Sequence, residues 1–306
     1  MSISNDILKE TRKALVGKDH ILRKVYTAIL AGGHVLLEDV PGVGKTTLAL
    51  AFSRAMSLNY SRMQFTPDVL PSDIVGFSMP DKATGNMIYK PGAILCNLFL
   101  ADELNRATSR TQSALLEAME ENQVTVDGVS HPLPDPFIVI ATQNPTGAAG
   151  TQLLPDSQMD RFMIRLSIGY PDPRSETEML KLHSADSAGE PVKAVTDAAG
   201  LAAIRRQAAN VYIADSVCDY IVALVAATRR SDYITRGASP RASLAVAAMA
   251  RATAWIDGRD YVVPEDVAGV LIDCLAHRVL FTPEGEDKRD EVLANILRAT
   301  PRPAIR

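Results

Sequence analysis

The chain has 306 residues, of which 47% are hydrophobic and 22% are charged, and its formal net charge is −4. This is the composition of a folded globular protein, with enough chain to bury one large core or two modest ones. No apolar run is long enough to cross a bilayer, the N-terminal residues lack the apolar core of a signal peptide, and the negative charge disfavours broad binding to nucleic acid. We therefore expect a cytoplasmic protein.

The first part of the chain alternates helical and strand patterns, which is typical of a parallel sheet covered by helices. Helical spacing of apolar residues precedes the glycine pair at 32–33, and it returns at Ser109–Glu121. Short apolar runs indicate buried strands at 34–37, 61–65, 97–101, 137–142 and 163–168. The predicted fold class is therefore α/β, with a five-stranded parallel sheet between helices.

A glycine-containing turn follows the first predicted strand and leads into the helical run 46–55. Its sequence, residues 39–46, is Asp-Val-Pro-Gly-Val-Gly-Lys-Thr. Such a turn lets backbone N–H groups converge on phosphate oxygens, and the positive end of the helix dipole adds to the attraction. Lys45 is then expected to reach the β- and γ-phosphates of a nucleotide, and the Thr46 hydroxyl to bind Mg²⁺.

The match to the phosphate-loop pattern has one departure, because Asp39 occupies the first glycine slot of G-x-x-x-x-G-K-[ST]. Short glycine-lysine runs also occur in ordinary strand-to-helix turns. The loop alone therefore leaves both interpretations open, and the rest of the chain must decide between them.

Two further strands end in polar residues that suit nucleotide hydrolysis. The run 98–101 is followed directly by Asp102 and Glu103, and the run 137–142 is followed by Gln143 and Asn144. Since ligands of open α/β sheets lie at the carboxyl ends of the strands, Asp102 is expected to hold Mg²⁺ and Glu103 to face the attacking water. Asn144 could orient that water. Between these strands, Gln123–Val129 alternates and turns at Asp-Gly, which predicts a hairpin.

Strand patterns stop at Tyr170–Pro173, where two prolines mark a natural hinge. We predict an α/β domain over residues 1–170 and a smaller all-helical domain over 171–306. Its predicted helices are 175–183, 201–209, 215–229, 240–255 and 264–280. The last two begin with proline, a residue that favours the first helical position.

These elements, in this order, resemble an AAA+ ATPase, and more closely the MoxR family. The resemblance covers nearly the whole chain and rests on several ordered blocks. They are VGKDHI (16–21), LLEDVPGVGKTTLA (36–49), QFTPDVLPSDIVGF (64–77), FLADELNRATSRTQSALLEAMEENQVTVDG (99–128), IATQNP (140–145), LPDSQMDRF (154–162) and SPRAS (239–243).

The resemblance implies a role for each matching residue. ATP would be bound by the loop residues and by Val16 and Gly17 against the adenine, with Mg²⁺ at Thr46 and Asp102. The loop residues are Pro41, Gly42, Val43, Gly44, Lys45, Thr46 and Thr47. Catalysis would fall to Glu103, to Asn144 as sensor 1, to Arg161 as the arginine finger that reaches a neighbouring subunit's γ-phosphate, and to Arg241 as sensor 2. A salt bridge of Arg161 with Asp160 is the structural alternative for that arginine.

The family also carries hairpin insertions, which match residues 79–91 and 123–134 here. The segment 146–149 departs from the family pattern because it lacks the expected acidic residues. The contact that those acids make elsewhere would then be absent.

The resemblance implies a ring-forming ATPase, hexameric because an arginine finger acts on a neighbouring subunit. Its work would be chaperone-like remodelling or metal-cofactor insertion on a client, together with a partner that carries a von Willebrand factor A domain. Three alternatives stay open: the ATPase subunit of a metal chelatase, a nucleic-acid remodelling motor, and an assembly module that binds nucleotide without hydrolysis. The motor is the weakest, because the hairpin 123–129 has no basic residue.

Overall fold

The fold is built on a five-stranded sheet in which all neighbouring strands run parallel. The computed structural model describes residues 3–144, 154–182 and 190–304; the segment 146–149 lies outside these ranges. In sheet order the strands are β2 (Tyr60–Gln64), β5 (Leu98–Asp102), β8 (Ile138–Gln143), β1 (Val35–Glu38) and β9 (Ile164–Leu166). The carboxyl ends of β5, β8 and β1 therefore meet at one edge, where the polar residues of the sequence analysis follow them.

Successive residues of the central strands point to opposite faces of the sheet, and both faces are buried. Leu98 and Leu100 of β5 belong to one hydrophobic cluster, whereas Phe99 and Ala101 belong to the other. The first cluster lies under α1 (Ile3–Arg12), α2 (Asp19–Leu30) and α3 (Lys45–Ala55), and the second under α4 (Pro71–Val75) and α5 (Ser109–Glu121). Burial on both faces explains why these strands read as continuous apolar runs.

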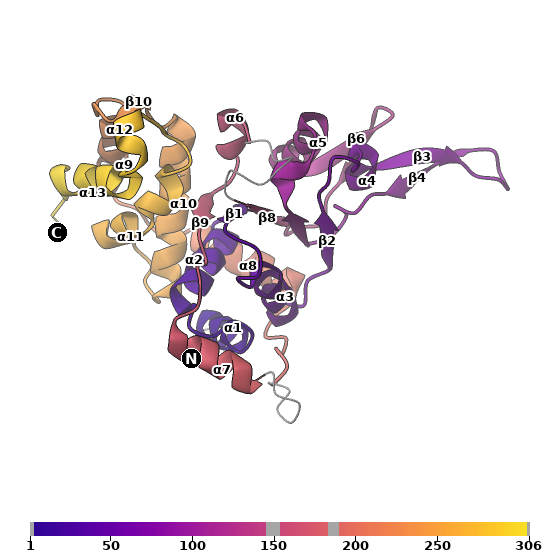
Figure 1. The fold of residues 1–306 in the computed structure, drawn as a ribbon, viewed down its shortest axis with the longest axis horizontal. Helices are drawn as coiled ribbons and strands as arrows, with labels where there is room; N and C mark the ends of the chain where they lie inside the picture. Colours follow the sequence, from indigo (N-terminus) through magenta and orange to yellow (C-terminus); the bar gives the residue numbers. More distant parts are fainter. Residues whose placement is uncertain (1–2, 145–153, 183–189, 305–306) are drawn as a thin grey trace.

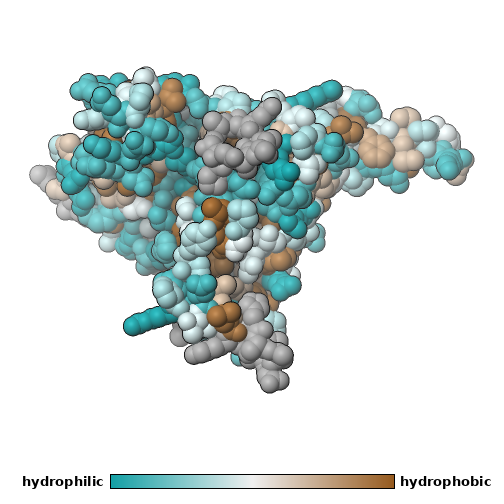
Figure 2. Space-filling view, in the orientation of Figure 1, coloured by the Kyte–Doolittle hydropathy of each residue, from teal (hydrophilic) through white to brown (hydrophobic). Residues whose placement is uncertain are grey.

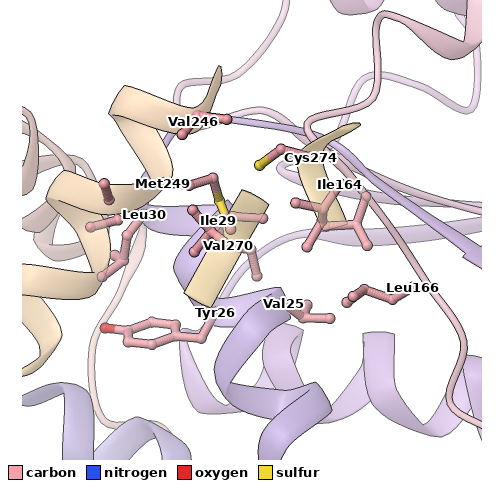
Figure 3. Close-up of a cluster of buried hydrophobic side chains, with 14 of the residues drawn as sticks. Val25, Tyr26, Ile29, Leu30, Ile164, Leu166, Val246, Met249, Val270 and Cys274 are labelled. Carbon is pink, nitrogen blue, oxygen red and sulfur yellow. The ribbon is translucent and has the colours of Figure 1, made fainter. Parts of the chain in front are cut away.

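The C-terminal helices pack onto the α/β part through a shared core (Figure 3). Val25, Tyr26 and Ile29 of α2 and Ile164 of β9 lie in the same cluster as Met249, on the helix α10 (Pro240–Ile256). The other elements of this part are α9 (Asp215–Thr228), β10 (Ile234–Arg236), α11 (Pro264–Leu275), β11 (Leu280–Phe281), α12 (Pro283–Glu286) and α13 (Arg289–Ala299). The relative position of the two parts is therefore set by hydrophobic burial as well as by the linker.

The C-terminal part differs from the helices that the sequence predicts, since α12 and α13 are not among them. The helix that begins at Pro264 ends at Leu275 rather than at Leu280, because Leu280 and Phe281 pair with β10 as a short antiparallel ribbon. The segment before α8 (Ala198–Ala209) runs along the α/β part, where the Val195 N–H donates to the Ala55 carbonyl oxygen at 2.8 Å. The helix α7 (Pro173–Leu182) packs at its start against the chain before α2, since a Cβ atom at Gly17 would clash with Oγ of Ser175.

Two hairpins extend from the side of the sheet that carries α4 and α5. One pairs β3 (Gly76–Pro80) with β4 (Met87–Pro91), and the other pairs β6 (Gln123–Val126) with β7 (Val129–Pro132). Tyr89 of the first stacks on His131 of the second, with ring centroids 3.7 Å apart. The β3–β4 hairpin forms an arm away from the body (Figure 1), and apolar residues gather along it (Figure 2). Within the described ranges, no helix has both the length and the apolar character that crossing a membrane requires.

Candidate nucleotide site

The loop between β1 and α3 has the backbone geometry of a phosphate-binding turn. Gly42 and Gly44 have φ angles of 87° and 99°, in the left-handed region that side chains disfavour. A Cβ atom at Gly44 would also lie 2.7 Å from Cδ1 of Leu15, so the loop is packed against the chain before α2. Because α3 begins at Lys45, its first N–H groups and the positive end of its dipole point toward the loop.

The aspartate in the first glycine slot has a structural function of its own. The Asp39 carboxylate is buried and accepts hydrogen bonds from the Ser167 hydroxyl at 3.1 Å and from the backbone N–H groups of Ile168 and Gly169. These three donors lie just after β9, the neighbouring strand. Asp39 therefore joins the start of the loop to the segment that leaves the sheet, which a glycine could not do.

The loop lysine is buried and connects two strand ends. Lys45 Nζ donates to the Asp39 carbonyl oxygen at 2.6 Å and to Asn144 Oδ1 at 3.2 Å. Burial lowers the pKa of Lys45, and the nearby carboxylates of Asp39, Asp102 and Glu103 oppose that shift. The ammonium is thus placed among groups that favour its charged form.

The acid at the end of β5 is held by two neighbours in the sheet. Asp102 Oδ1 accepts from the Thr142 hydroxyl at 2.7 Å, and Asp102 Oδ2 accepts from Arg62 Nη2, also at 2.7 Å. The Glu103 N–H donates to the same Thr142 oxygen at 2.9 Å. Thr142 therefore fixes the turn after β5, in which Glu103 has a φ of 56°.

Both carboxylate oxygens of Glu103 are engaged. Oε1 accepts from Asn144 Nδ2 at 3.1 Å, and Oε2 accepts from Arg106 Nη1 at 2.7 Å, from the short helix η1 (Leu104–Arg106). The Arg106 guanidinium is the main reason that the pKa of Glu103 is lowered, and the Asn144 amide adds to it. Glu103 is therefore ionised at neutral pH, the state that a base requires.

These groups line one cavity of about 390 Å³ at the carboxyl edge of the sheet. The residues around it are Pro41, Gly42, Gly44, Lys45, Thr46, Thr47, Arg62, Gln64, Asp102, Glu103 and Asn144. Val43 instead packs in the hydrophobic core. Val16 and Gly17 are not among the described residues that line the cavity, although Leu15 beside them contacts Gly44.

The donor set in this cavity suits Mg²⁺. The Thr46 hydroxyl and the Asp102 carboxylate are oxygen ligands on the same cavity. Asp102 Oδ2 accepts from both Nε and Nη2 of Arg62, whereas Oδ1 accepts only from Thr142 and keeps a lone pair for a water of the ion's shell. Magnesium is held in nucleotide sites by few protein ligands and retains several waters, so two protein oxygens fit it.

Arg161 and Arg241 do not lie in this cavity, and the structure places them together elsewhere. Both guanidiniums contact the carboxylate of Glu120, and all three residues line a second cavity of about 420 Å³. Asp160 contacts Arg278 instead, with its Oδ1 atom 2.9 Å from Nε. The salt bridge between Arg161 and Asp160 that sequence reasoning offered as an alternative is thus replaced by one with Glu120.

Four residues of this site were not singled out from the sequence. Arg62 and Gln64 line the cavity, and Arg106 and Thr142 hydrogen-bond to the lining acids Glu103 and Asp102. The position of Arg106, one helical turn after Glu103, offered a signal for a pair with that acid. Arg62 and Thr142 lie on the two strands that flank β5. They could have been found only if the order of the strands in the sheet had been known.

Three features define a phosphate-loop nucleotide-binding protein. They are the strand order, the glycine loop that enters a helix, and the acids at the end of β5, which lies two strands from β1 in the sheet. Comparison with known families agrees: residues 34–164 match the ATPase family associated with various cellular activities (AAA), and residues 226–296 match the AAA lid domain.

Individual relatives cover most of the chain. Chaperone MoxR1 of Mycobacterium tuberculosis is 39% identical over 89% of this chain and 74% of its own length. YeaC of Bacillus subtilis is 43% identical over 91% of this chain and 87% of its own length. The crystal structure of a candidate ATPase from Cytophaga hutchinsonii superposes with a TM-score of 0.91 at 37% identity, covering 99% of this chain and 96% of that one. The chain belongs to the MoxR family of AAA+ ATPases, and the predicted fold class is confirmed.

Proposed function

We propose that this chain binds ATP with Mg²⁺ in the cavity beside the phosphate loop and hydrolyses it to ADP and phosphate. The observation that carries the proposal is the convergence of Lys45, Asp102, Glu103 and Asn144 on that cavity. These side chains come from three separate strand ends and are joined by hydrogen bonds between Lys45, Asn144 and Glu103. Membership of an ATPase family supports the same reaction.

Each residue has a chemical role in this proposal. The N–H groups of the loop and of the first turn of α3 bind the phosphates, and Lys45 neutralises their charge. Thr46 and Asp102 hold Mg²⁺, which supplies further neutralisation at the β- and γ-phosphates when bound. Glu103 takes a proton from water as the water oxygen attacks the γ-phosphorus, and the bond to the β-phosphate oxygen breaks. Asn144 orients that water.

The protein is proposed to act as a hexameric ring. Arg161 and Arg241 line a different cavity from the one that holds Lys45. We therefore assign their phosphate contacts to the nucleotide of a neighbouring subunit. Such an arginine stabilises the charge that develops during phosphoryl transfer. Hydrolysis in the ring would change how the α/β and helical domains, divided near residues 170–173, sit relative to one another.

The work of the ring is proposed to be chaperone-like remodelling or metal-cofactor insertion on a client protein. Support comes from the relative named Chaperone MoxR1. The partner with a von Willebrand factor A domain rests on the family resemblance alone. Purification through a subunit that binds ATP without hydrolysing it, followed by identification of the retained protein, addresses both.

ATP turnover by the Glu103→Gln variant tests the proposed reaction. Gln keeps the size of Glu103 but cannot accept the proton, so turnover should fall by roughly 10²- to 10⁴-fold while ATP still binds. Glu117→Gln, on the exposed face of α5, is the matched control and should turn over like the wild type. If the wild type hydrolyses ATP no faster than Glu103→Gln at protein concentrations where rings form, the protein is a nucleotide-dependent assembly module instead.

A further inference from the structure

Glu120 connects two arginines that come from different parts of the fold. It lies in the last turn of α5, whereas Arg161 follows α6 (Asp156–Met159) and Arg241 lies in the first turn of α10. Oε2 of Glu120 contacts Arg161 Nη1, and Oε1 contacts Arg241 Nη2. Each carboxylate oxygen thus serves one guanidinium.

The backbone around these arginines is already fixed by other contacts. Arg161 Nη1 reaches the Leu116 carbonyl oxygen of α5 at 3.4 Å. The Ser239 hydroxyl, which precedes α10, donates to Asp160 Oδ2 at 3.1 Å, and Arg278 contacts the other oxygen of Asp160. These contacts leave open the position of the Arg241 guanidinium, and they hold the Arg161 guanidinium only through the 3.4 Å contact with Leu116; both groups end long side chains with high rotamer freedom.

The charge of Glu120 can fix the positions of both guanidiniums. Two guanidiniums close together repel each other, and an intervening carboxylate offsets the repulsion. The side chains of Glu120 and Arg161 are 33% and 29% exposed, so solvent screens this pair less than a fully exposed one. A guanidinium has five N–H donors, and Glu120 engages a single Nη nitrogen of each. The other donors can therefore bind phosphate while the carboxylate stays in place.

We propose that Glu120 is a positioning residue that holds Arg161 and Arg241 as one unit, so that both present their guanidiniums together to the phosphates of a neighbouring subunit's nucleotide. The inference rests on the proposed ATPase function and deepens it, because it assigns a residue outside the cavity that holds Lys45. Its chemistry requires two acceptor oxygens. An amide of the same size has one acceptor oxygen, and its NH2 group would face the second guanidinium, so Gln in the place of Glu120 holds one arginine only.

The test compares Glu120→Gln with Glu121→Gln, its exposed neighbour at the end of the same helix. Loss of one charge-assisted contact should lower kcat for ATP hydrolysis by about tenfold. The KM for ATP should change less than about twofold, since the Lys45 cavity is separate, and ring mass by light scattering should be unchanged. Glu121→Gln should match the wild type. Glu120→Asp, which keeps both oxygens, should retain more turnover than Glu120→Gln.

A double variant separates positioning from a general structural effect. In the Arg241→Ala background, adding Glu120→Gln should cost less than about twofold, because one amide oxygen suffices for the single remaining arginine. The inference is overturned if Glu120→Gln turns over like the wild type, if it costs the same tenfold without Arg241, or if Asp does no better than Gln. Failure of the proposed function looks different, because the wild type itself would then show no turnover.

Discussion

Arg278 donates from Nη2 to the carbonyl oxygen of Phe162 at 2.8 Å, which ties the C-terminal part to the residue that follows Arg161. The same nitrogen reaches the Asp160 carbonyl oxygen at 3.2 Å, and the side chain is only 4% exposed. His277 beside it is hydrogen-bonded through Nε2 to the Phe162 oxygen at 2.8 Å. The loop that carries Arg161 is therefore held by the C-terminal part rather than by the sheet alone.

Replacing Arg278 with Met should show how much that attachment stabilises the protein. Met has a similar length but no donor, so buried carbonyl oxygens lose a partner, at a cost of about 2–4 kcal/mol in the free energy of unfolding. Urea denaturation measures this value. Arg302→Met is the control, because Arg302 is 54% exposed and lies 3.5 Å from Glu265; it should change stability by less than about 0.5 kcal/mol. Equal effects of the two substitutions would contradict the prediction.

Asp39→Gly, which restores the glycine of the phosphate-loop pattern, should destabilise the protein. It removes the acceptor for Ser167 and for the N–H groups of Ile168 and Gly169, and it adds backbone freedom to the unfolded chain. We expect a loss of about 2–4 kcal/mol in the free energy of unfolding. Asp39→Asn, which keeps one acceptor oxygen, should lose less. A glycine variant as stable as the wild type would mean that these contacts contribute nothing.

Arg106→Gln should change the pH dependence of ATP hydrolysis. Arg106 is the main cause of the lowered pKa of Glu103, so its removal raises that pKa toward the ordinary value. A larger fraction of Glu103 is then protonated as the pH falls. The acidic limb of the profile of kcat against pH should move to higher pH, while the alkaline limb stays in place. An unchanged acidic limb would show that Glu103 does not titrate in the reaction.

Two glycine-to-alanine substitutions should change the stability of the protein in opposite directions. At Gly44 the φ of 99° and the contact with Leu15 oppose a side chain, so Gly44→Ala should lose both stability and ATP affinity. At Gly269, an exposed position within α11, a Cβ atom has open space, so Gly269→Ala should gain up to about 1 kcal/mol. Thermal unfolding and ATP titration of the two variants measure these effects. Similar melting temperatures for both would contradict this view of the loop.

Much of the fold could be predicted because its signals are local. The strands of the sheet lie within a few residues of the apolar runs, and α5 spans Ser109–Glu121 as the pattern indicates. Lys45, Asp102, Glu103 and Asn144 could be grouped because parallel strands end at one edge. The roles assigned to these residues, and the domain boundary at 170, stay predictions.

What the sequence could not provide depends on contacts between distant segments. The partner of Arg161 is Glu120 rather than the adjacent Asp160, since the packing of α5 against the loop after α6 brings the former closer. The ribbon of β10 and β11 has strands of three and two residues, too short for a periodic pattern. Arg62 acts on Asp102 only because β2 lies beside β5.

The attachment of Asp39 to the residues after β9 has a mechanical consequence. Lys18, at the entry to α2, donates to the carbonyl oxygens of Ile168 and Tyr170, both at 2.7 Å. The start of the phosphate loop, the entry to α2 and the exit of the chain from the sheet thus form one rigid junction. Any displacement of the loop would therefore pull, through covalent chain and hydrogen bonds alone, on residues 167–170, from which the chain leaves the sheet toward the C-terminal helices.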